Sequence, residues 1–408
     1  MEPEAEGCDT VIATHETILT EIRPLWHVVE DRVAHNVART LEAFTNSGLS
    51  TPDLQGSTGY GYDDRGRILL DRVVAEIMGT EAALVRSQWV SGTHAINTVL
   101  QALAPTTKRL WVVSGPIYDT MEPILFDTSN PLSLRARGIE IRYVNINEWE
   151  SRPSEEPFAD VIYIQRSRGY QSRPSWGRDK IAPIITLAHR HQALVIVDNC
   201  YGEFTDTEEP GHWGADLVVG SLMKNPGGGI APTGAYVAGN QLLCDRVADQ
   251  LFAPGIGGEV GPTGPYQRLL AQGWFMAPMV VGEALMGGIY AAALFHRAGF
   301  EVDSVSANKN DIVTAIRLGN ADRVKIFCAV IQAHSPIDST VTPVPWSMPG
   351  YADPIIMAAG GFVAGASLEL SADAPMREPY WVYLQGGLSR WHTTKASRVA
   401  LEALVAAD

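Results

Sequence analysis

The chain has 408 residues, more than one hydrophobic core usually serves, so a large domain accompanied by smaller units is expected. Its 46% hydrophobic and 19% charged residues are typical of a globular protein and exclude a disordered one. The net charge of −15, which no basic cluster offsets, argues against nucleic acid as a partner and favours a small-molecule substrate.

The N-terminal segment and the cysteines indicate the compartment. The first twenty residues contain acids but no basic region followed by an apolar one, so no secretory signal is expected. The four cysteines, at positions 8, 200, 244 and 328, are widely spaced and match no metal-ligand pattern. We therefore expect buried or free thiols, no metal site and a cytoplasmic protein.

Two features precede the main domain. Apolar residues recur at helical spacing over residues 10–48, which predicts one or two amphipathic helices within an N-terminal arm of residues 1–55. Such an arm can pack on another subunit or cap its own core. The turn region "GSTGYGYDDRGR" follows at residues 56–67 and carries Tyr60 and Tyr62.

Alternating apolar runs and helical stretches predict a large α/β domain over residues 56–300. The runs are continuously apolar, as expected for strands buried on both faces of a mainly parallel sheet that helices cover. The candidate strands are residues 109–114, 141–146, 161–165, 193–198, 216–221 and 234–239.

One apolar segment, residues 274–295, is long enough to cross a bilayer. Pro278 and the acidic Glu283 in mid-span favour a helix buried in a core or a subunit interface instead, so no membrane is expected. Beyond residue 300 the composition changes to short runs punctuated by proline. A smaller α+β domain is predicted over residues 301–408, ending in a helix at about 392–406.

Polar side chains follow several candidate strands. In open α/β sheets ligands bind outside the carboxyl ends of the strands, so these residues are expected to converge. Each is weak alone, because an acid that ends a strand more often caps the next turn and a loop tyrosine more often packs. The residues are Tyr118, Gln165, Arg166, Asp198, Ser221 and Lys224.

Lys224 is the most informative of them. Only six of the 31 basic residues are lysines, and this one lies between an apolar run and a glycine turn in "GSLMKNPGGG". A solvated surface lysine needs no such setting. Burial lowers the pKa of a lysine, and the neutral amine is the nucleophile that forms a Schiff base.

A second glycine feature is "SGTHAI", residues 91–96, at the predicted start of a helix. The backbone amides of Ser91, Gly92 and Thr93 would form an anion site there, although for this stretch alone an ordinary N-cap is the better explanation. No Walker loop and no dinucleotide-binding glycine pattern occurs.

A phosphate cradle, a Schiff-base lysine, a strand-end acid and an aromatic ring together describe one cofactor, pyridoxal 5′-phosphate. Lys224 would hold its aldehyde. Asp198 would pair with the pyridine nitrogen and keep it protonated, and Tyr118 would stack on the ring.

With these residues assembled, the sequence resembles the pyridoxal-phosphate family related to methionine γ-lyase and the cystathionine enzymes, in the branch of aluminium-resistance proteins. The resemblance covers most of residues 50–390 and implies the aspartate-aminotransferase-like fold, fold type I. Its matching stretches include "GSTGYGYDDRGR", "VSGTHAI", "YIQRSRGY", "VDNCYGEF", "GSLMKNPGGGIAPTGAYVAG" and "SLELSADAPMREPYWVYLQGG".

The resemblance also implies roles for individual residues. Lys224 carries the cofactor and removes the Cα proton, Asp198 partners the pyridine nitrogen, and Tyr118 stacks and assists the leaving group. Arg377 is the best match for the arginine that binds the substrate carboxylate, where guanidinium geometry suits a carboxylate. The remaining predicted contacts are Ser91, Gly92, Thr93, Gln165 and Ser221 to the cofactor and Arg166 to the substrate.

The resemblance further implies a homodimer or homotetramer with shared active sites, in which Tyr60 and Tyr62 reach the neighbouring cofactor. The sequence departs from the branch at Met279, where a histidine is common, and at Arg390, where a tyrosine is common. Trp89, Trp274 and Trp391 are unusually bulky. If these positions line the substrate pocket, the leaving group differs from the sulfur usual in the family.

The activity implied is elimination or replacement at Cγ of an L-α-amino acid. The unsaturated product would be released as a 2-oxo acid and ammonia, captured by a nucleophile, or kept as an unsaturated amino acid, for example after loss of halide. Alternatives on the same cofactor are β-elimination, racemisation and transamination. A non-catalytic pyridoxal-phosphate-binding protein belongs to a different class, and a dehydrogenase lacks its glycine fingerprint.

Overall fold

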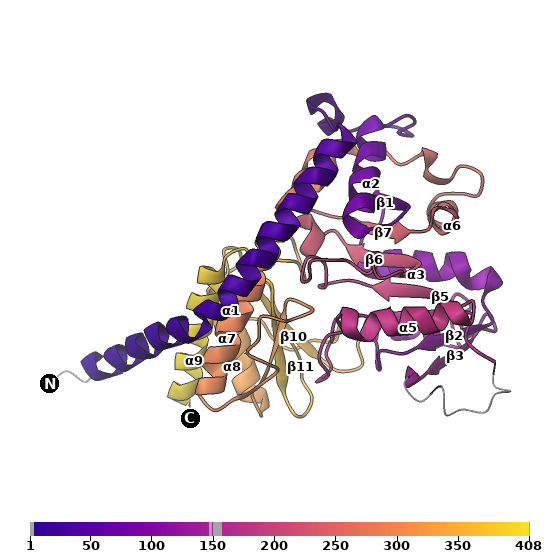
Figure 1. The fold of residues 1–408 in the computed structure, drawn as a ribbon. Helices are drawn as coiled ribbons and strands as arrows, with labels where there is room; N and C mark the ends of the chain where they lie inside the picture. Colours follow the sequence, from indigo (N-terminus) through magenta and orange to yellow (C-terminus); the bar gives the residue numbers. More distant parts are fainter. Residues whose placement is uncertain (1–3, 147–148, 150–156, 408) are drawn as a thin grey trace.

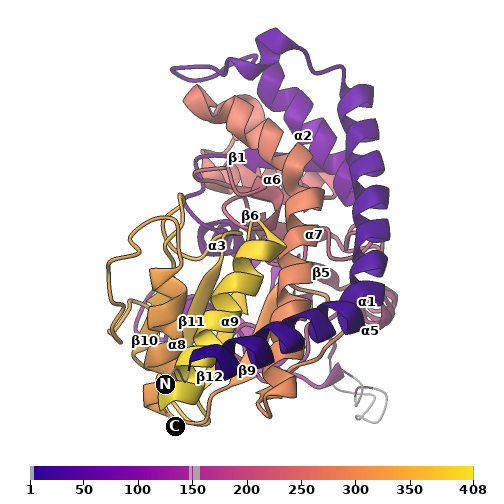
Figure 2. The same ribbon diagram turned by 90° about the vertical axis from the view of Figure 1, so that its left-hand side faces the viewer.

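The computed structural model describes residues 4–146, 149 and 157–407, with side chains from residue 15 onward. Two β-sheets, each with its own helices, are joined by two long helices that lie side by side (Figures 1 and 2). The N-terminal arm is one helix, α1 (Glu4–Ser47), which continues through Pro24. The expected one or two helices are thus a single one.

The large sheet has seven strands in the order β1-β7-β6-β5-β4-β2-β3. Strands β2 to β6 run parallel, whereas β7 is antiparallel to both of its neighbours. This mostly parallel sheet confirms the predicted α/β class. Its strands are β1 (Ala82–Arg86), β2 (Arg109–Val112), β3 (Glu140–Tyr143), β4 (Val161–Gln165), β5 (Leu194–Asp198), β6 (Leu217–Ser221) and β7 (Ala235–Gly239).

Six of these strands lie where continuous apolar runs predicted them, with ends that differ by up to three residues. Strand β1 was not predicted, because its sequence "AALVR" is equally suited to a helix. It becomes a strand by pairing with β7, in register from Ala82 opposite Gly239 to Arg86 opposite Ala235. A partner more than 140 positions away in the chain therefore decides its conformation.

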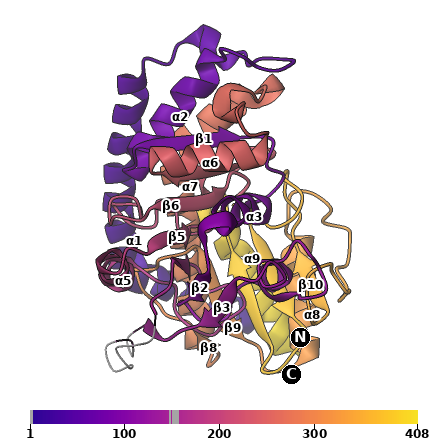
Figure 3. The same cartoon turned by 90° about the vertical axis from the view of Figure 1, so that its right-hand side faces the viewer.

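Helices cover both faces of the large sheet (Figure 3). Buried residues of α2 and α5 share one core with alternate side chains of β5, and those of α3 and α6 share the other. Local caps set the helix ends: Asp64 accepts a hydrogen bond from the Arg67 amide at the start of α2, and Gly79, with φ of 68°, ends it. The helices are α2 (Arg65–Met78), α3 (Gly92–Leu103), α4 (Glu122–Phe126), α5 (Arg178–Arg190) and α6 (Gln241–Leu251).

Helix α7 (Gln267–Arg297) contains the apolar segment that is long enough for a membrane. In the structure 89% of its most apolar window is buried inside the protein, so the expectation of a buried core helix is confirmed. It packs between α1 and the C-terminal helix (Figure 2). Gly282 permits this packing, since a side chain there would overlap Val33 of α1.

The second sheet belongs to the C-terminal part of the chain and is entirely antiparallel, in the order β10-β11-β12-β9-β8. Two helices, α8 (Ala321–Ala333) and α9 (Arg390–Ala407), accompany it. The strands are β8 (Glu301–Val302), β9 (Val313–Arg317), β10 (Ile355–Ala358), β11 (Ser371–Pro375) and β12 (Trp381–Gln385).

A buried group of charges connects the loop after β4 to the start of the second sheet. Asp303 forms ion pairs with Arg168 at 2.9 Å and with Lys309 at 3.2 Å, and the Arg168 amide donates to Asp311 at 3.1 Å. All four side chains are almost fully buried. Such pairs stabilise only as a complete set, since removing one partner leaves a buried charge uncompensated. They hold the two sheets in one fixed arrangement.

Phe327 provides an apolar contact between α8 and α7. Its fully buried ring has its centroid 5.6 Å from that of Phe295 on α7. We expect Phe327→Ala to lower the free energy of unfolding by about 3–5 kcal/mol through the cavity it leaves. Urea unfolding followed by circular dichroism measures this loss. The control Phe362→Ala removes a ring that is 71% exposed and should change stability little. Equal effects of the two substitutions would contradict the packing described.

Candidate active site

The carboxyl ends of strands β4, β5 and β6 meet the second sheet around a cavity of about 130 Å³. This is the position at which open α/β sheets bind ligands. Both parts of the chain contribute to its wall. The large sheet and its loops provide Thr93, Tyr118, Asp198, Cys200, Tyr201 and Lys224, and the small sheet provides Asp373, Tyr383 and Gln385.

The glycine turn places Lys224 at this cavity. Strand β6 ends at Ser221, and the Lys224 amide donates back to the Ser221 carbonyl at 3.2 Å. A Cβ atom on Gly227 would overlap the Leu222 carbonyl, and one on Gly228 would lie 2.5 Å from the Gly273 carbonyl of α7. The turn is therefore side-chain-free because helix α7 packs directly on its backbone.

The Lys224 amine lies among aromatic rings. Its nitrogen is 3.9 Å from the centroid of the Tyr201 ring and 5.7 Å from that of Tyr118. Tyr201 has a φ of 68°, which is unusual for a residue with a bulky side chain and typical of constrained functional sites.

The charge state of the free lysine differs from the expectation. Burial lowers the pKa of Lys224, but its neighbours raise it well above the usual range. The neighbours that raise it are Tyr201, Cys200, Tyr118 and Asp198. The expectation that burial alone keeps the amine neutral is therefore wrong for the free chain, where it is a cation.

Asp198 ends β5 and is almost fully buried. One carboxylate oxygen accepts a hydrogen bond from the Cys200 amide at 3.1 Å, and the other accepts from the Tyr163 hydroxyl at 3.1 Å. Burial raises the pKa of Asp198, whereas the Lys224 charge and these donors lower it. A carboxylate held in this way can partner a protonated ring nitrogen.

Tyr118 is fixed at both ends. Its hydroxyl lies 2.6 Å from the Ser167 hydroxyl, and its amide donates to the Gln165 side-chain oxygen at 2.9 Å. The Gln165 side-chain nitrogen donates to the Ser167 carbonyl. The Gln165 side chain thus holds the loops around Tyr118 through both ends of its amide, and its predicted contact with the cofactor remains a prediction.

The start of helix α3 is pressed against the strand ends. A Cβ atom on Gly92 would lie 3.0 Å from the Cys200 sulfur and 3.2 Å from Cβ of Ser221, so only glycine brings the backbone this close. Ser91 caps the helix by accepting from the His94 amide at 3.1 Å. Thr93 lines the cavity. The first amides of a helix lack partners within it and attract an anion, as a phosphate cradle requires.

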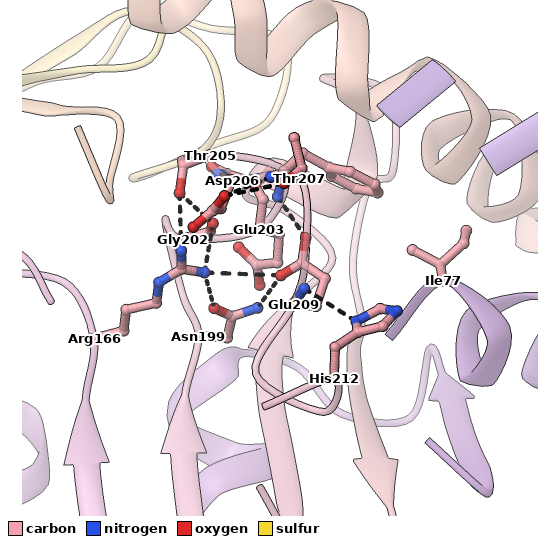
Figure 4. A network of polar contacts seen from close by, with 12 residues as sticks. Ile77, Arg166, Asn199, Gly202, Glu203, Thr205, Asp206, Thr207, Glu209 and His212 are labelled. Atoms are coloured by element: carbon pink, nitrogen blue, oxygen red, sulfur yellow. Dashed lines mark hydrogen bonds and ion pairs between the residues drawn. The ribbon is translucent and has the colours of Figure 1, made fainter. Parts of the chain in front are cut away.

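Arg166 lies outside the cavity, contrary to its predicted contact with the substrate. Its guanidinium donates to the Asn199 side-chain oxygen at 2.8 Å and the Gly202 carbonyl at 2.9 Å (Figure 4). It also lies 3.8 Å from the Glu209 carboxylate and stacks over the Trp213 ring. This side chain is fully buried beneath the loop after β5, and its donors serve the fold.

Arg377 is likewise not brought into the cavity. It pairs with Asp353 at 2.9 Å and borders a neighbouring groove of about 330 Å³. Tyr170 and Tyr383 line both the groove and the cavity, so Arg377 lies one side chain away. Its predicted contact with the substrate carboxylate remains a prediction.

The bulky tryptophans do not shape the pocket. Trp89 and Trp274 are fully buried in the cores, and Trp391 is 55% exposed and packs against Trp26. Met279 is also half exposed, and Arg390 forms ion pairs with acids on α1 and α7. None of these positions lines the cavity, so they do not argue for an unusual leaving group.

Tyr60 and Tyr62 lie on the surface, 74% and 60% exposed, with ring centroids 5.7 Å apart. Neither lines the cavity of its own chain.

Several cavity residues were not predicted. Tyr201 lies three residues after the strand end at Asp198, within the matching stretch "VDNCYGEF", so its position was a usable signal. Tyr351, Asp373, Tyr383 and Gln385 were also missed, although the last three lie in the matching stretch at residues 367–387 from which Arg377 was chosen. Their proximity to Lys224 arises only when the two sheets pack together.

These residues fit pyridoxal phosphate. The absence of a Cβ atom at Gly92 lets the start of α3 lie against Cys200 and Ser221 at the strand ends. A lysine amine, a buried carboxylate and an aromatic ring share one cavity with that helix start. This donor set matches the aldehyde, ring nitrogen and ring face of the cofactor.

Comparison with known proteins supports the same cofactor. The sequence matches the methionine gamma-lyase family over residues 11–405. A Clostridium novyi structure, a carbon–sulfur lyase involved in aluminium resistance, is 38% identical, with a TM-score of 0.90 and coverage of 98% of this chain and 99% of that one. A Listeria monocytogenes protein assigned as a cystathionine beta-lyase involved in aluminium resistance is 40% identical, with a TM-score of 0.91 and coverage of 96% and 99%.

The L-methionine gamma-lyase of Pseudomonas putida is more distant, at 28% identity over 44% of this chain and 42% of that protein. Family match, fold and site geometry agree on one cofactor and one architecture. The chain belongs to the methionine gamma-lyase family of pyridoxal 5′-phosphate enzymes and has the fold type I architecture.

Proposed function

We propose that this chain eliminates a sulfur leaving group from Cγ of an L-α-amino acid. The observation that carries the proposal is the Lys224 amine, held in a small cavity with Asp198 on the same strand-end edge and two tyrosine rings beside it. The family match supports carbon–sulfur lyase chemistry and favours departure from Cγ. The Listeria relative, assigned as a β-lyase, makes β-elimination the main rival.

Each residue has a defined task in this proposal. The backbone at Gly92 and Thr93, with Ser221 beside it, would hold the phosphate of the cofactor, Asp198 would hold its ring nitrogen and Tyr118 its ring face. Pyridoxal phosphate held there would supply a sink for the electron pair released when the substrate Cα loses its proton.

Lys224 moves the protons. Its neutral amine takes the Cα proton and then, for γ-elimination, a proton from Cβ, because the flexible stem of a lysine reaches adjacent carbons. The surrounding rings of Tyr118 and Tyr201 exclude water from this amine and confine its motion. β-Elimination needs only the first of these proton transfers.

The test of the proposed function begins with the absorbance of the purified protein and continues with a substrate panel. We expect a cofactor band that shifts on addition of L-methionine or an S-alkyl-homocysteine, with release of thiol and 2-oxobutanoate. Release of pyruvate from S-alkyl-cysteines, with no reaction at Cγ, would show that the chain catalyses β-elimination and not γ-elimination. A γ-chloro amino acid tests halide as leaving group. Band shifts with nothing released would indicate transamination, racemisation or a non-catalytic binding protein.

Lys224→Ala should abolish both the absorbance band of lysine-bound cofactor and thiol release, because no other residue replaces the amine. Lys180→Ala removes an exposed lysine on α5 and serves as the matched control, with unchanged spectrum and rate. Spectra and thiol release are measured side by side at equal protein concentration. Retention of the band and of full activity in Lys224→Ala would remove this lysine from the site.

We also propose that the chain works as a homodimer or homotetramer in which Tyr60 and Tyr62 reach the neighbouring subunit's cofactor. Their large exposure in one chain supports this arrangement, since such aromatic surface is usually covered.

Shared sites predict complementation between defective subunits. Lys224→Ala and a Tyr60→Phe/Tyr62→Phe double variant should each have low activity. Co-expressed in equal amounts, they should recover about a quarter of wild-type activity, because half of randomly paired dimers contain one intact site. Separately purified proteins that are not mixed provide the baseline. Recovery no higher than that baseline would show that both tyrosines act within their own chain, or not at all.

A cytoplasmic location is part of the proposal. The described cysteines 200, 244 and 328 are buried and unpaired, as in proteins of reducing compartments. Cys8 lies outside the residues whose side chains the structure describes.

A further inference from the structure

Asp373 is a buried acid of the cavity, and one of its carboxylate oxygens lacks a hydrogen-bond partner among the described residues. It lies on β11 of the small sheet, and only 2% of the residue is exposed. Its Oδ2 atom accepts hydrogen bonds from the Tyr170 hydroxyl at 3.3 Å and from the Gln385 side-chain nitrogen at 3.0 Å. Its Oδ1 atom is buried and has no hydrogen-bond partner among the described residues.

An unsatisfied buried oxygen of this kind needs an explanation, because burying a polar atom without a partner is unfavourable. Asp373 lines the same cavity as Lys224 and Asp198. A ligand bound there would lie against the Asp373 carboxyl group, whose Oδ1 atom the described residues leave without a partner.

The surroundings of Asp373 also shift its pKa. Burial raises its pKa to about 7, although Tyr170, Lys224 and Gln385 each lower it. Both its protonated and its ionised forms therefore exist near neutral pH, which suits a group that transfers protons. The other titratable groups around it have pKa values raised above their usual range, and they are Tyr170, Tyr201, Cys328, Tyr351 and Tyr383.

Tyr118, the residue expected to assist the leaving group, is poorly suited to that task. Its hydroxyl already lies 2.6 Å from Ser167, and burial raises its pKa well above the usual value. The carboxyl group of Asp373 has a lower pKa than Tyr118 and is therefore the stronger acid of the two in the cavity wall.

We propose that Asp373 is a catalytic acid that protonates the departing sulfur, an inference that rests on the proposed elimination. The carbon–sulfur bond breaks and its electron pair stays on sulfur. The proton of the Asp373 carboxyl moves to that sulfur, so the group leaves as a neutral thiol and Asp373 becomes a carboxylate. Water returns the proton after the thiol has departed.

The closing experiment compares two substrates of nearly equal size, S-ethyl- and S-(2,2,2-trifluoroethyl)-homocysteine. Fluorine stabilises the departing thiolate, so the second substrate needs little help from an acid. Asp373→Asn should lower kcat with the S-ethyl substrate about 100-fold or more and lower it far less with the trifluoroethyl one, while KM changes little. Asp322→Asn, an equal charge change at an exposed site on α8, should leave both rates unchanged.

A second variant keeps the test independent of folding. The protonated acid is the active form, so the S-ethyl rate of the wild type should fall as pH rises through about 7. Tyr170→Phe removes a hydrogen bond that lowers the pKa of Asp373, so the fall should move to higher pH. The absorbance band of bound cofactor confirms that both variants are folded and loaded.

The outcomes separate the two hypotheses. If the wild type releases no thiol from either substrate, the proposed function fails, and this inference fails with it. If the wild type is active but Asp373→Asn loses nothing, loses both substrates equally, or changes only KM, Asp373 is not the acid. An unmoved pH profile in Tyr170→Phe would overturn the assignment even where Asp373→Asn does not fold.

Discussion

The direct packing of helix α7 on the glycine turn after Lys224 is the constraint on which the site depends. Gly227 and Gly228 approach the backbone of Gly273 so closely that no side chain fits between them. Helix α7 in turn contacts α1, α9 and strand β9 of the small sheet. The position of the lysine is thereby coupled to the packing of both parts of the chain.

The two buried carboxyl groups of the cavity lie in different environments. Asp198 receives hydrogen bonds on both oxygens and lies at the strand end beside the lysine charge, an arrangement that suits a permanent ionic partner. Asp373 receives its hydrogen bonds on one oxygen only and titrates near neutrality. Two acids held in different hydrogen-bond environments are an arrangement by which a site divides charge stabilisation from proton transfer.

Buried polar groups behind the cavity hold its wall in place. Asn199 accepts from Arg166 and donates to Glu209 (Figure 4). The Glu203 carbonyl accepts from the side chain of Asn225, the residue after Lys224. The guanidinium at Arg166 thus contributes to the site indirectly, by fixing the loop after β5. An arginine adjacent to a strand end can serve the fold as well as a ligand, and only its surroundings distinguish the two.

The sequence by itself determined six of the seven strands of the large sheet, because continuous apolar runs indicate burial on both faces whatever lies next to them. It also predicted that Asp198 and Lys224 lie at the ends of strands, because those positions are local properties of the chain. The tertiary structure alone decided that β1 is a strand, that Arg166 serves the fold, and that Asp373 lines the cavity. Each of these depends on partners distant in sequence, and no local pattern encodes them.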